Sequence, residues 1–238
     1  HWREERLSDA RELMADPILL DWVRKWRANP GDATLTEPLR GKLDAYRAAN
    51  AYLSVCLVDG RGVALLDVGH PGFGHPHGAE GDIQRAHSGN IPVLPDLHSE
   101  GAELPVHISI IAPLGSPPGA AGDPARATAL IIAIDPHHSF YPMVQEWPLP
   151  SPSGETLLIE RSGDHVLYLN ELRHRSNTAL RFRLPIDTPG LVGGMAVQGK
   201  TDIQGGLDYR GVPVLSVIRA VPGTPWTLVT KLARKEFI

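Results

Sequence analysis

The sequence predicts an α+β protein: a helical N-terminal segment followed by two lobes, each an antiparallel β-sheet flanked by helices. Apolar residues recur at helical spacing over the first fifty residues, and the alternation typical of strands begins at Tyr52. The same order of elements then appears twice, before and after the proline-rich stretch 147–152. The expected divisions are residues 1–51, 52–147 and 148–238.

The N-terminal segment contains two predicted helices. The first runs from Trp2 to Arg27 and is kinked or broken around Asp16-Pro17, because proline lacks a backbone donor. Thr34-x-x-Glu37 has the pattern of a capping box, which predicts that a second helix starts there and continues to about Asn50. The charged faces of both helices are interpreted as solvated surface.

The first lobe begins with a hairpin, in which Tyr52–Val58 and Val63–Val68 flank a turn at 59–62. Cys56 lies inside the first apolar strand and is interpreted as a buried small hydrophobe. The remaining predicted elements are a short helix at 83–87, an extended segment at 91–94, and strands at 106–114 and 127–134. This order is typical of a PAS-like lobe.

The second lobe repeats that order without residue-level identity. A hairpin formed by 156–160 and 165–169 is followed by irregular or short helical segments over 170–197. A tight turn on Asp208 and Gly211 then leads to strands at 212–221 and 226–232. Their connections are too short for parallel crossovers, so the strands form an antiparallel meander.

The C-terminal strands carry a family resemblance. Asp208-Tyr209-Arg210-Gly211 at the head of Val212–Leu215, the turn at Pro222-Gly223, and the strand Trp226-Thr227-Leu228-Val229 resemble the closing sheet of double Cache sensor regions. Such regions are the extracytoplasmic input of bacterial histidine kinases, chemoreceptors and diguanylate cyclases. The resemblance implies a long N-terminal helix that spans a membrane-distal and a membrane-proximal lobe, and a histidine kinase is the first choice of parent.

Composition limits the other function classes. The formal charge of -4 with interspersed signs provides no basic face for nucleic acid. No apolar run approaches the roughly 20 residues that cross a bilayer, and the single cysteine excludes an internal disulfide. The chain starts at His1 without a methionine, so we expect a fragment of a longer, membrane-anchored receptor whose N-terminal helix mediates a homodimer.

Polar residues on one strand indicate a binding site. Along 106–114, alternation places His107, Ser109 and Ile111 on one face, where polar groups either meet solvent or line a cavity. Asp135 follows the last buried strand and would hold a cationic or hydroxyl group, although a helix cap would have the same pattern. The candidate ligand-binding residues are Asp96, His98, His107, Ser109, Asp135 and Arg85.

The resemblance adds detail to this site. Asp96 and Asp135 match two acidic positions of double Cache members that bind amino acids, but the aromatic-Arg-aromatic element of those members is absent. Residues 81–86 stand in its place, with Arg85 as the cation. Either Arg85 binds a ligand carboxylate, or Asp96, Asp135 and His107 hold a neutral or cationic ligand. The expected ligand is an amino acid, amine or organic acid, and no cofactor is expected.

Two alternatives stay open. His70, His75 and His77, with Asp67, have the ligand types of a zinc site, although a solvated loop explains the same composition. No nucleophile elbow, P-loop or zinc-protease helix is present, so a sensor is favoured over a metal-dependent or hydrolytic periplasmic enzyme. A ligand-free module that senses a partner protein is the third interpretation, and it predicts a distal pocket filled by its own side chains.

Overall fold

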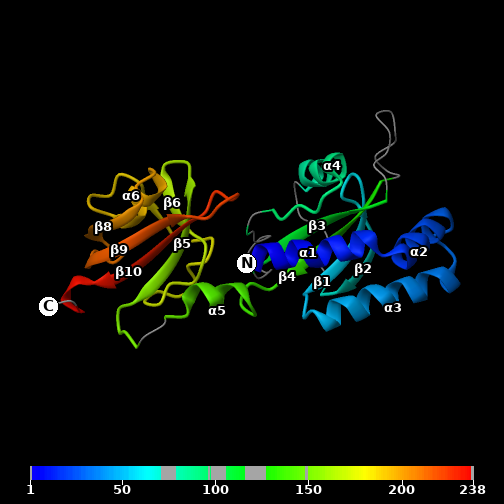
Figure 1. Ribbon diagram of the computed structural model, residues 1–238, viewed down its shortest axis with the longest axis horizontal. Helices are drawn as coiled ribbons and strands as arrows, with labels where there is room; N and C mark the ends of the chain where they lie inside the picture. The colour runs from blue at the N-terminus through cyan, green and yellow to red at the C-terminus, as the bar shows by residue number, and fades with distance from the viewer. Residues whose placement is uncertain are drawn as a thin grey trace. The chain divides into compact units, whose positions relative to one another are not determined.

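The computed structural model divides the chain into two compact units, residues 1–136 and 137–238 (Figure 1). The structure describes residues 2–70, 79–95, 97, 106–115, 127–147 and 150–236. Within these ranges it contains six α-helices and two antiparallel sheets, which confirms the predicted α+β class with two PAS-like lobes.

Unit 1 begins with three helices: α1 (Trp2–Ala15), α2 (Pro17–Ala28) and α3 (Ala33–Ala49). The predicted break at Asp16-Pro17 is confirmed, and the Asp16 carboxylate accepts hydrogen bonds from the first backbone amides of α2. Three helices of unit 1 therefore stand where the resemblance implied one long helix.

The start of α3 differs from the capping-box prediction. Asp32, rather than Thr34, is the N-cap residue, and its carboxylate accepts a hydrogen bond from the Thr34 backbone amide at 2.9 Å. Aspartate at this position satisfies an amide that has no partner within the helix. Thr34 instead lies in the first turn.

Unit 1 contains a four-stranded antiparallel sheet of order β2-β1-β4-β3. Residues Cys56, Ile111 and Ile131 face helix α4 and pack with its Ile83. Their strand neighbours alternate to the opposite face, where α1 contacts β3 and α3 contacts β1 and β2. The elements are β1 (Ser54–Asp59), β2 (Ala64–Gly69), α4 (Glu80–Gly89), β3 (Ile108–Leu114) and β4 (Thr128–Ile134).

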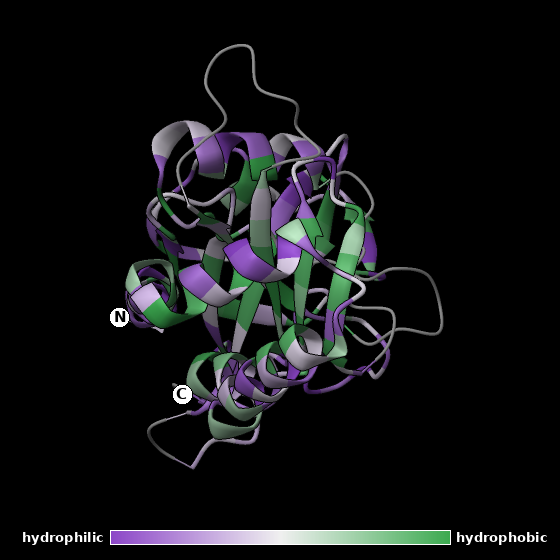
Figure 2. Ribbon diagram, turned by 90° about the vertical axis from the view of Figure 1, so that its right-hand side faces the viewer, coloured by the Kyte–Doolittle hydropathy of each residue, from purple (hydrophilic) through white to green (hydrophobic). Residues whose placement is uncertain are grey.

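Unit 2 contains a six-stranded antiparallel sheet of order β7-β6-β5-β10-β9-β8. Leu157, Ile159 and Val229 form its core with Val192 and Ala196 of helix α6. The elements are α5 (Phe140–Gln145), β5 (Glu155–Ser162), β6 (His165–Tyr168), β7 (Arg183–Pro185), α6 (Val192–Val197), β8 (Asp202–Leu207), β9 (Pro213–Ala220), β10 (Thr227–Ala233) and the 3-10 helix η2 (Arg234–Glu236). Figure 2 shows hydrophobic residues concentrated along the strands.

The boundary between the units falls at Pro136, before the predicted end of the first lobe at Trp147. Helix α5, which was not predicted, packs on the sheet of unit 2 and explains the difference. The Tyr141 hydroxyl donates a 2.6 Å hydrogen bond to the Leu169 carbonyl, and the rings of Phe140 and Trp226 lie 5.6 Å apart. The residues around α5 therefore belong to unit 2.

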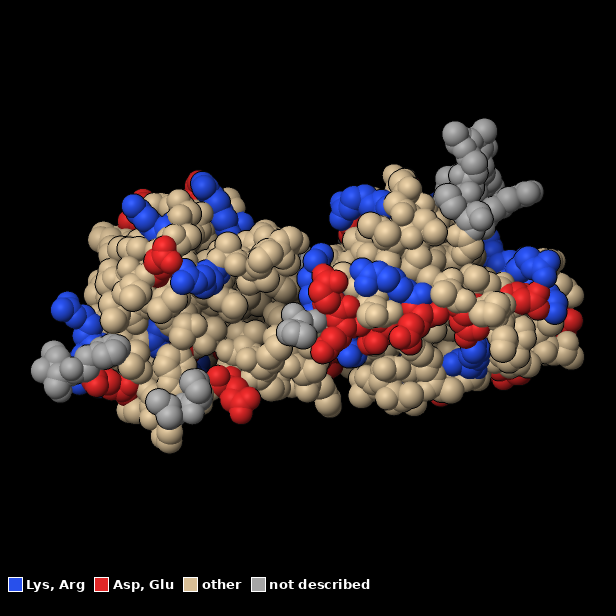
Figure 3. All heavy atoms as spheres, in the orientation of Figure 1, with Lys and Arg blue, Asp and Glu red and all other residues tan. Residues whose placement is uncertain are grey.

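The charged side chains of helix α1 lie on the solvent-exposed face of the helix, as the sequence analysis expected. Figure 3 shows a run of acidic side chains along the face formed by α1, where Glu4, Glu5 and Glu12 are exposed. Arg6 pairs with Asp9 at 3.2 Å within the same run. In the part of the chain that the structure describes, no helix has the length and apolar character required to cross a bilayer.

Glycine at position 194 is required by the packing of α6. A Cβ atom there would lie 2.4 Å from the Ile186 carbonyl oxygen, which is backbone and cannot rotate away. We expect Gly194→Ala to destabilise unit 2 by about 1–3 kcal/mol, because overpacking forces backbone shifts. Hydrogen exchange of the amides of β5 and β10 measures this change.

Gly41→Ala is the matched control, since a Cβ atom at Gly41 in helix α3 would meet nothing within 4 Å. Alanine stabilises a helix interior relative to glycine by up to about 1 kcal/mol, so this variant should be at least as stable as the parent. Equal exchange rates in the parent and in Gly194→Ala would contradict the packing described here.

Candidate ligand-binding site

Three of the predicted residues lie together at one end of the unit 1 sheet. His107 and Ser109 share the face of β3 that carries Ile111, as the alternation predicted. In the register of β3 and β4, Ser109 is opposite Ala133 and Ile108 is opposite Ile134. The alternation of β3 and β4 therefore directs His107 and Asp135, the residues that flank this ladder, to the same face as Ser109.

Strands β1 and β2 add two polar residues to this face. Ser54 is opposite Ala133 on one side and Gly69 on the other, and Cys56 is opposite Asp67. Because Cys56 packs under α4, the alternation places Ser54 and Asp67 on the same face of the sheet. We call these residues, Ser54, Asp67, His107, Ser109 and Asp135, the polar face.

The polar face is largely shielded from solvent. Ser54, His107 and Ser109 are each 0% exposed, and Asp135 is half-buried. Among the described residues, the Ser54 hydroxyl has no hydrogen-bond partner. A buried hydroxyl without a partner is costly in a folded protein, so this position favours a polar group that approaches it.

Cys56 marks the transition from polar to apolar surface. Burial, together with the negative charge of Asp67, raises the pKa of the Cys56 thiol to about 12. The thiol therefore stays protonated near neutral pH and acts as a small apolar group rather than a nucleophile. Beyond it, Ile83 and Ala86 of α4 pack directly on Ile111 and Ile131. The polar face is thus bounded by a packed apolar layer.

Arg85 does not join the polar face. Its side chain is 69% exposed and pairs with Asp82 one turn earlier on α4, whereas the buried side of that helix is formed by Ile83, Ala86 and His87. The local pattern could not distinguish the two sides of so short a helix. This placement gives no support to Arg85 as a clamp for a ligand carboxylate.

The remaining predicted positions are distributed as follows. Asp96 and His98 lie outside the described residues, as do His75 and His77 of the suggested zinc site. Among the residues that the structure describes, no group of three or more His, Cys, Asp or Glu side chains could hold a metal ion. Ser54 was missed, although its parity with Cys56 in the first strand was a usable signal, and Asp67 was considered only as a ligand of the suggested zinc site.

Unit 2 contains a different polar group, a buried ion cluster. The Lys231 ammonium lies 2.9 Å from Glu155 and 3.0 Å from Asp208, and all three side chains are at most 4% exposed. The Tyr209 hydroxyl donates to Glu155, and Arg210 contacts Asp208 at 2.7 Å. Tyr209 and Arg210 therefore complete the hydrogen bonds of this cluster.

The carboxylate of Asp208 also forms the predicted turn. It accepts hydrogen bonds from the backbone amides of Arg210 and Val212, while Gly211 adopts a positive φ of 77°. Burial opposes ionisation of Asp208, but the hydrogen bonds from Arg210 and Lys231 outweigh it and hold its pKa below the ordinary value. Asp208 is therefore ionised in the folded state at neutral pH.

Structures of known proteins share this fold. The ligand-binding domain of the Campylobacter jejuni chemoreceptor Tlp3, in complex with 4-methylisoleucine, matches with a TM-score of 0.63 and 13% identity, covering 99% of this chain and 84% of that one. The extracellular domain of the putative histidine kinase vpHK1S-Z8 matches with a TM-score of 0.55 and 11% identity, covering 97% and 88%.

The ligand-binding domain of the Pseudomonas aeruginosa chemoreceptor PctB, in complex with L-Gln, gives a TM-score of 0.51 and 13% identity, covering 98% of this chain and 88% of that one. No family model and no curated protein matches the sequence. The fold is thus that of extracellular ligand-binding domains of chemoreceptors and histidine kinases, as the resemblance to double Cache regions implied.

Removal of Lys231 tests the ion cluster. Lys231→Met leaves two buried carboxylates without their cation, so we expect unit 2 to lose about 3–5 kcal/mol of stability. Amide hydrogen exchange in β5, β9 and β10 reports this loss. The control is Lys200→Met, an exposed position for which we expect a change within about 0.5 kcal/mol. Equal effects of both substitutions would refute the cluster's role.

The depressed pKa of Asp208 predicts a dependence of stability on pH. Because its folded pKa lies below the unfolded value of about 3.9, its contribution is present above that pH and is lost as pH falls through the folded pKa. The stability difference between the parent and Asp208→Asn should therefore be constant near neutral pH and shrink below about pH 4. A difference independent of pH down to pH 2 would contradict this.

Proposed function

We propose that the chain is the extracytoplasmic ligand-sensing region of a transmembrane signal-transduction receptor, and that it binds a small polar ligand at the polar face of unit 1. Unit 1 corresponds to the membrane-distal lobe in this proposal. The observation that carries it is the convergence of five polar side chains from all four strands of the unit 1 sheet, in a fold shared with ligand-binding domains.

The chemistry of the polar face favours a ligand with an ammonium or hydroxyl group. Asp135 and Asp67 are carboxylates, which accept hydrogen bonds from cations, and Ser54, Ser109 and His107 supply donors and acceptors. Amino acids and amines carry such groups. Because Arg85 lies on the exposed side of α4, a ligand carboxylate has no arginine partner from that helix.

The ligands of the similar structures are consistent with this class. The similar ligand-binding domains are in complex with 4-methylisoleucine in Tlp3, with L-Gln and L-Arg in PctB, and with asparagine in Mlp24. Each of these ligands has an α-ammonium group, which can donate a hydrogen bond to an aspartate carboxylate. For the present chain we propose an amino acid or amine whose ammonium group binds Asp135.

Signal transfer requires a ligand that binds two arrangements of unit 1 with different affinities. A ligand that binds one arrangement of unit 1 more tightly than another shifts the population toward that arrangement. Asp135 is next to Pro136, the last residue of unit 1, so a ligand held by Asp135 acts directly on the connection between the units. The output of a two-component histidine kinase is our first choice, followed by a chemoreceptor, with the receptor anchored in the cytoplasmic membrane and dimeric.

A thermal unfolding screen tests this function. The probes are amino acids, amines, organic acids, purines and divalent metals. A probe at about 100 times its dissociation constant adds about 2.7 kcal/mol to the native state. We expect an amino acid or amine to raise the melting temperature, and Asp135→Asn to abolish the increase. The control is Asp164→Asn, an exposed aspartate of unit 2, which should leave the increase unchanged.

Other outcomes assign other functions. An increase with metals alone favours a metal site in the histidine-rich segment. No increase with any probe contradicts small-molecule sensing and favours the partner-sensing module, for which the packing of Ile83 and Ala86 on the sheet is the supporting observation. An increase that persists in Asp135→Asn places the ligand elsewhere.

A further inference from the structure

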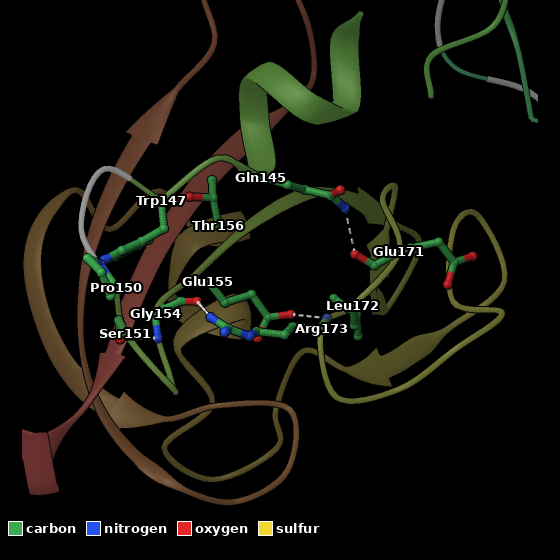
Figure 4. A pocket seen from close by; sticks show the side chains of 10 residues that line it. All are labelled: Gln145, Trp147, Pro150, Ser151, Gly154, Glu155, Thr156, Glu171, Leu172 and Arg173. Carbon is green, nitrogen blue, oxygen red and sulfur yellow. Dashed lines mark hydrogen bonds between the residues drawn. The ribbon is translucent and has the colours of Figure 1, made fainter. Parts of the chain in front are cut away.

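The beginning of β5 lies beside a cavity that the proposed function does not use. Its volume is about 660 Å³, and it lies entirely within unit 2, open to solvent (Figure 4). The end of α5, the start of β5 and the loop that follows β6 line it. It is separate from the inner face of the sheet, where Leu157 and Tyr168 belong to the hydrophobic core.

An indole ring forms one wall of this cavity. A Cβ atom at Gly154 would lie 2.6 Å from Cε2 of Trp147, so the ring lies directly against the glycine backbone. A side chain at position 154 would displace the indole. Leu172 and Pro150 add apolar surface to the same cavity. These groups suit a ligand with a flat apolar ring, because aromatic rings stack favourably on an indole.

Arg173 supplies a cation that lines the same cavity. The backbone amide of Arg173 donates to Glu155 at 2.7 Å, and its guanidinium Nη1 donates to the Gly154 carbonyl at 2.7 Å (Figure 4). These two hydrogen bonds fix the backbone of Arg173 and the Nη1 edge of its guanidinium. Arg173 is exposed, and among the described residues its Nε and Nη2 have no hydrogen-bond or ion-pair partner, so both can donate to a ligand.

The two acidic side chains of the cavity are already engaged. Glu155 pairs with Lys231 at 2.9 Å and accepts hydrogen bonds from Tyr209. The Glu171 carboxylate accepts hydrogen bonds from the backbone amides of Thr178 and Ala179, and it points away from Arg173 (Figure 4). Hydrogen bonds from neutral amides leave the negative charge of Glu171 in place, so the cavity contains one carboxylate that points away from Arg173 and one guanidinium that is open to a ligand.

The neighbouring residue His174 is affected by the same positive charges. Burial lowers the pKa of His174, and the charges of Arg210, Lys231 and Arg173 lower it further, against an opposing effect of Glu155. An anion entering the cavity would meet this field and an unpaired guanidinium. Arginine is well suited to such a role, because its planar fork matches the two oxygens of a carboxylate.

We propose that this cavity is a second ligand site, which binds a small organic carboxylate with a flat apolar body. The carboxylate pairs with the free edge of Arg173, and the body lies against Trp147. Gln145 lines the same cavity and donates its amide hydrogen to the Glu171 carbonyl at 2.9 Å, which leaves its carbonyl oxygen for a hydroxyl of the ligand.

The site is coupled to the end of the described chain. Ser151, which lines the cavity, donates a 2.8 Å hydrogen bond to Glu236 of η2, and the backbone amide of Ser153 donates to the same carboxylate at 3.2 Å. The Ala233 amide in turn donates to the Ser153 hydroxyl at 2.9 Å. Residues 151–153 beside the cavity are therefore hydrogen-bonded both to η2 and to the end of β10.

Titration with benzoate tests this proposal. The readout is the indole N–H resonance of Trp147 in a ¹H–¹⁵N spectrum, assigned with Trp147→Phe. We expect benzoate to shift this resonance saturably below about 10 mM, a weak but specific affinity. Benzamide has the same shape without the charge, and it should bind at least about tenfold more weakly, because a hydrogen bond to a charged group is lost.

Two arginine variants locate the carboxylate. Arg173→Gln should weaken benzoate binding at least about tenfold. Arg175→Gln is the matched control, since Arg175 lies in the same loop but packs over the Phe182 ring, 4.3 Å from its centroid, and should bind benzoate like the parent. The spectra of β5 and β10 amides show whether each variant retains its fold.

The result that overturns the proposal is specific. It fails if benzoate does not shift the Trp147 resonance, if benzamide binds as tightly, or if folded Arg173→Gln binds benzoate like the parent. The comparison of benzoate with benzamide uses the parent chain alone, so it stands even where a variant misfolds. Benzoate binding should be unchanged in Asp135→Asn, which separates this site from the proposed sensor site of unit 1.

Discussion

The interaction on which unit 2 depends is the buried contact of Lys231 with Asp208 and Glu155. It joins three points that are distant in sequence: the start of β5, the turn between β8 and β9, and the middle of β10. A buried ammonium is tolerated only where carboxylates compensate its charge, so these three elements have one arrangement in which all groups are satisfied. Each lost partner leaves another charge buried, and the cluster therefore favours a single native arrangement over alternatives that pack equally well.

The two units use buried polar groups in opposite ways. In unit 2 the charges are mutually compensated, and Tyr209 and Arg210 complete the hydrogen bonds around them. In unit 1 the polar face contains carboxylates, hydroxyls and an imidazole, Arg40 donates to the Asp67 backbone carbonyl at 2.8 Å, and among the described residues the buried Ser54 hydroxyl has no hydrogen-bond partner. A satisfied network rigidifies a lobe, whereas a buried hydroxyl without a partner gains a hydrogen bond when a polar group of a ligand approaches it. This difference is the physical reason for assigning the sensory role to unit 1.

Much of the fold could be predicted because local patterns and tertiary packing agree. The hairpins, the break at Pro17 and the turn on Asp208 each follow from alternation or from residues with restricted backbone conformations. Helix α5 and the short strand β7 were missed, because six and three residues carry too little periodicity. His107 and Ser109 were identified by parity along one strand, but Ser54 and Asp67 come from strands paired through β4. Their position on the polar face depends on the register, which the sequence does not show.

The position of Asp135 links the site to the fold. Strand β4 is central in its sheet, paired on both sides by β1 and β3, and every one of its residues is buried. Such a strand cannot shift alone, since a one-residue slip would move all its side chains to the wrong face. In the proposed function, a ligand at Asp135 acts at the end of this strand, one residue before Pro136, the last residue of unit 1. The residues that follow are held by the hydrogen bond of Tyr141 to Leu169 and by the packing of Phe140 on Trp226. Residues 135–139 thus form a short connection between the end of β4 and the start of α5, and Asp135 is its first residue.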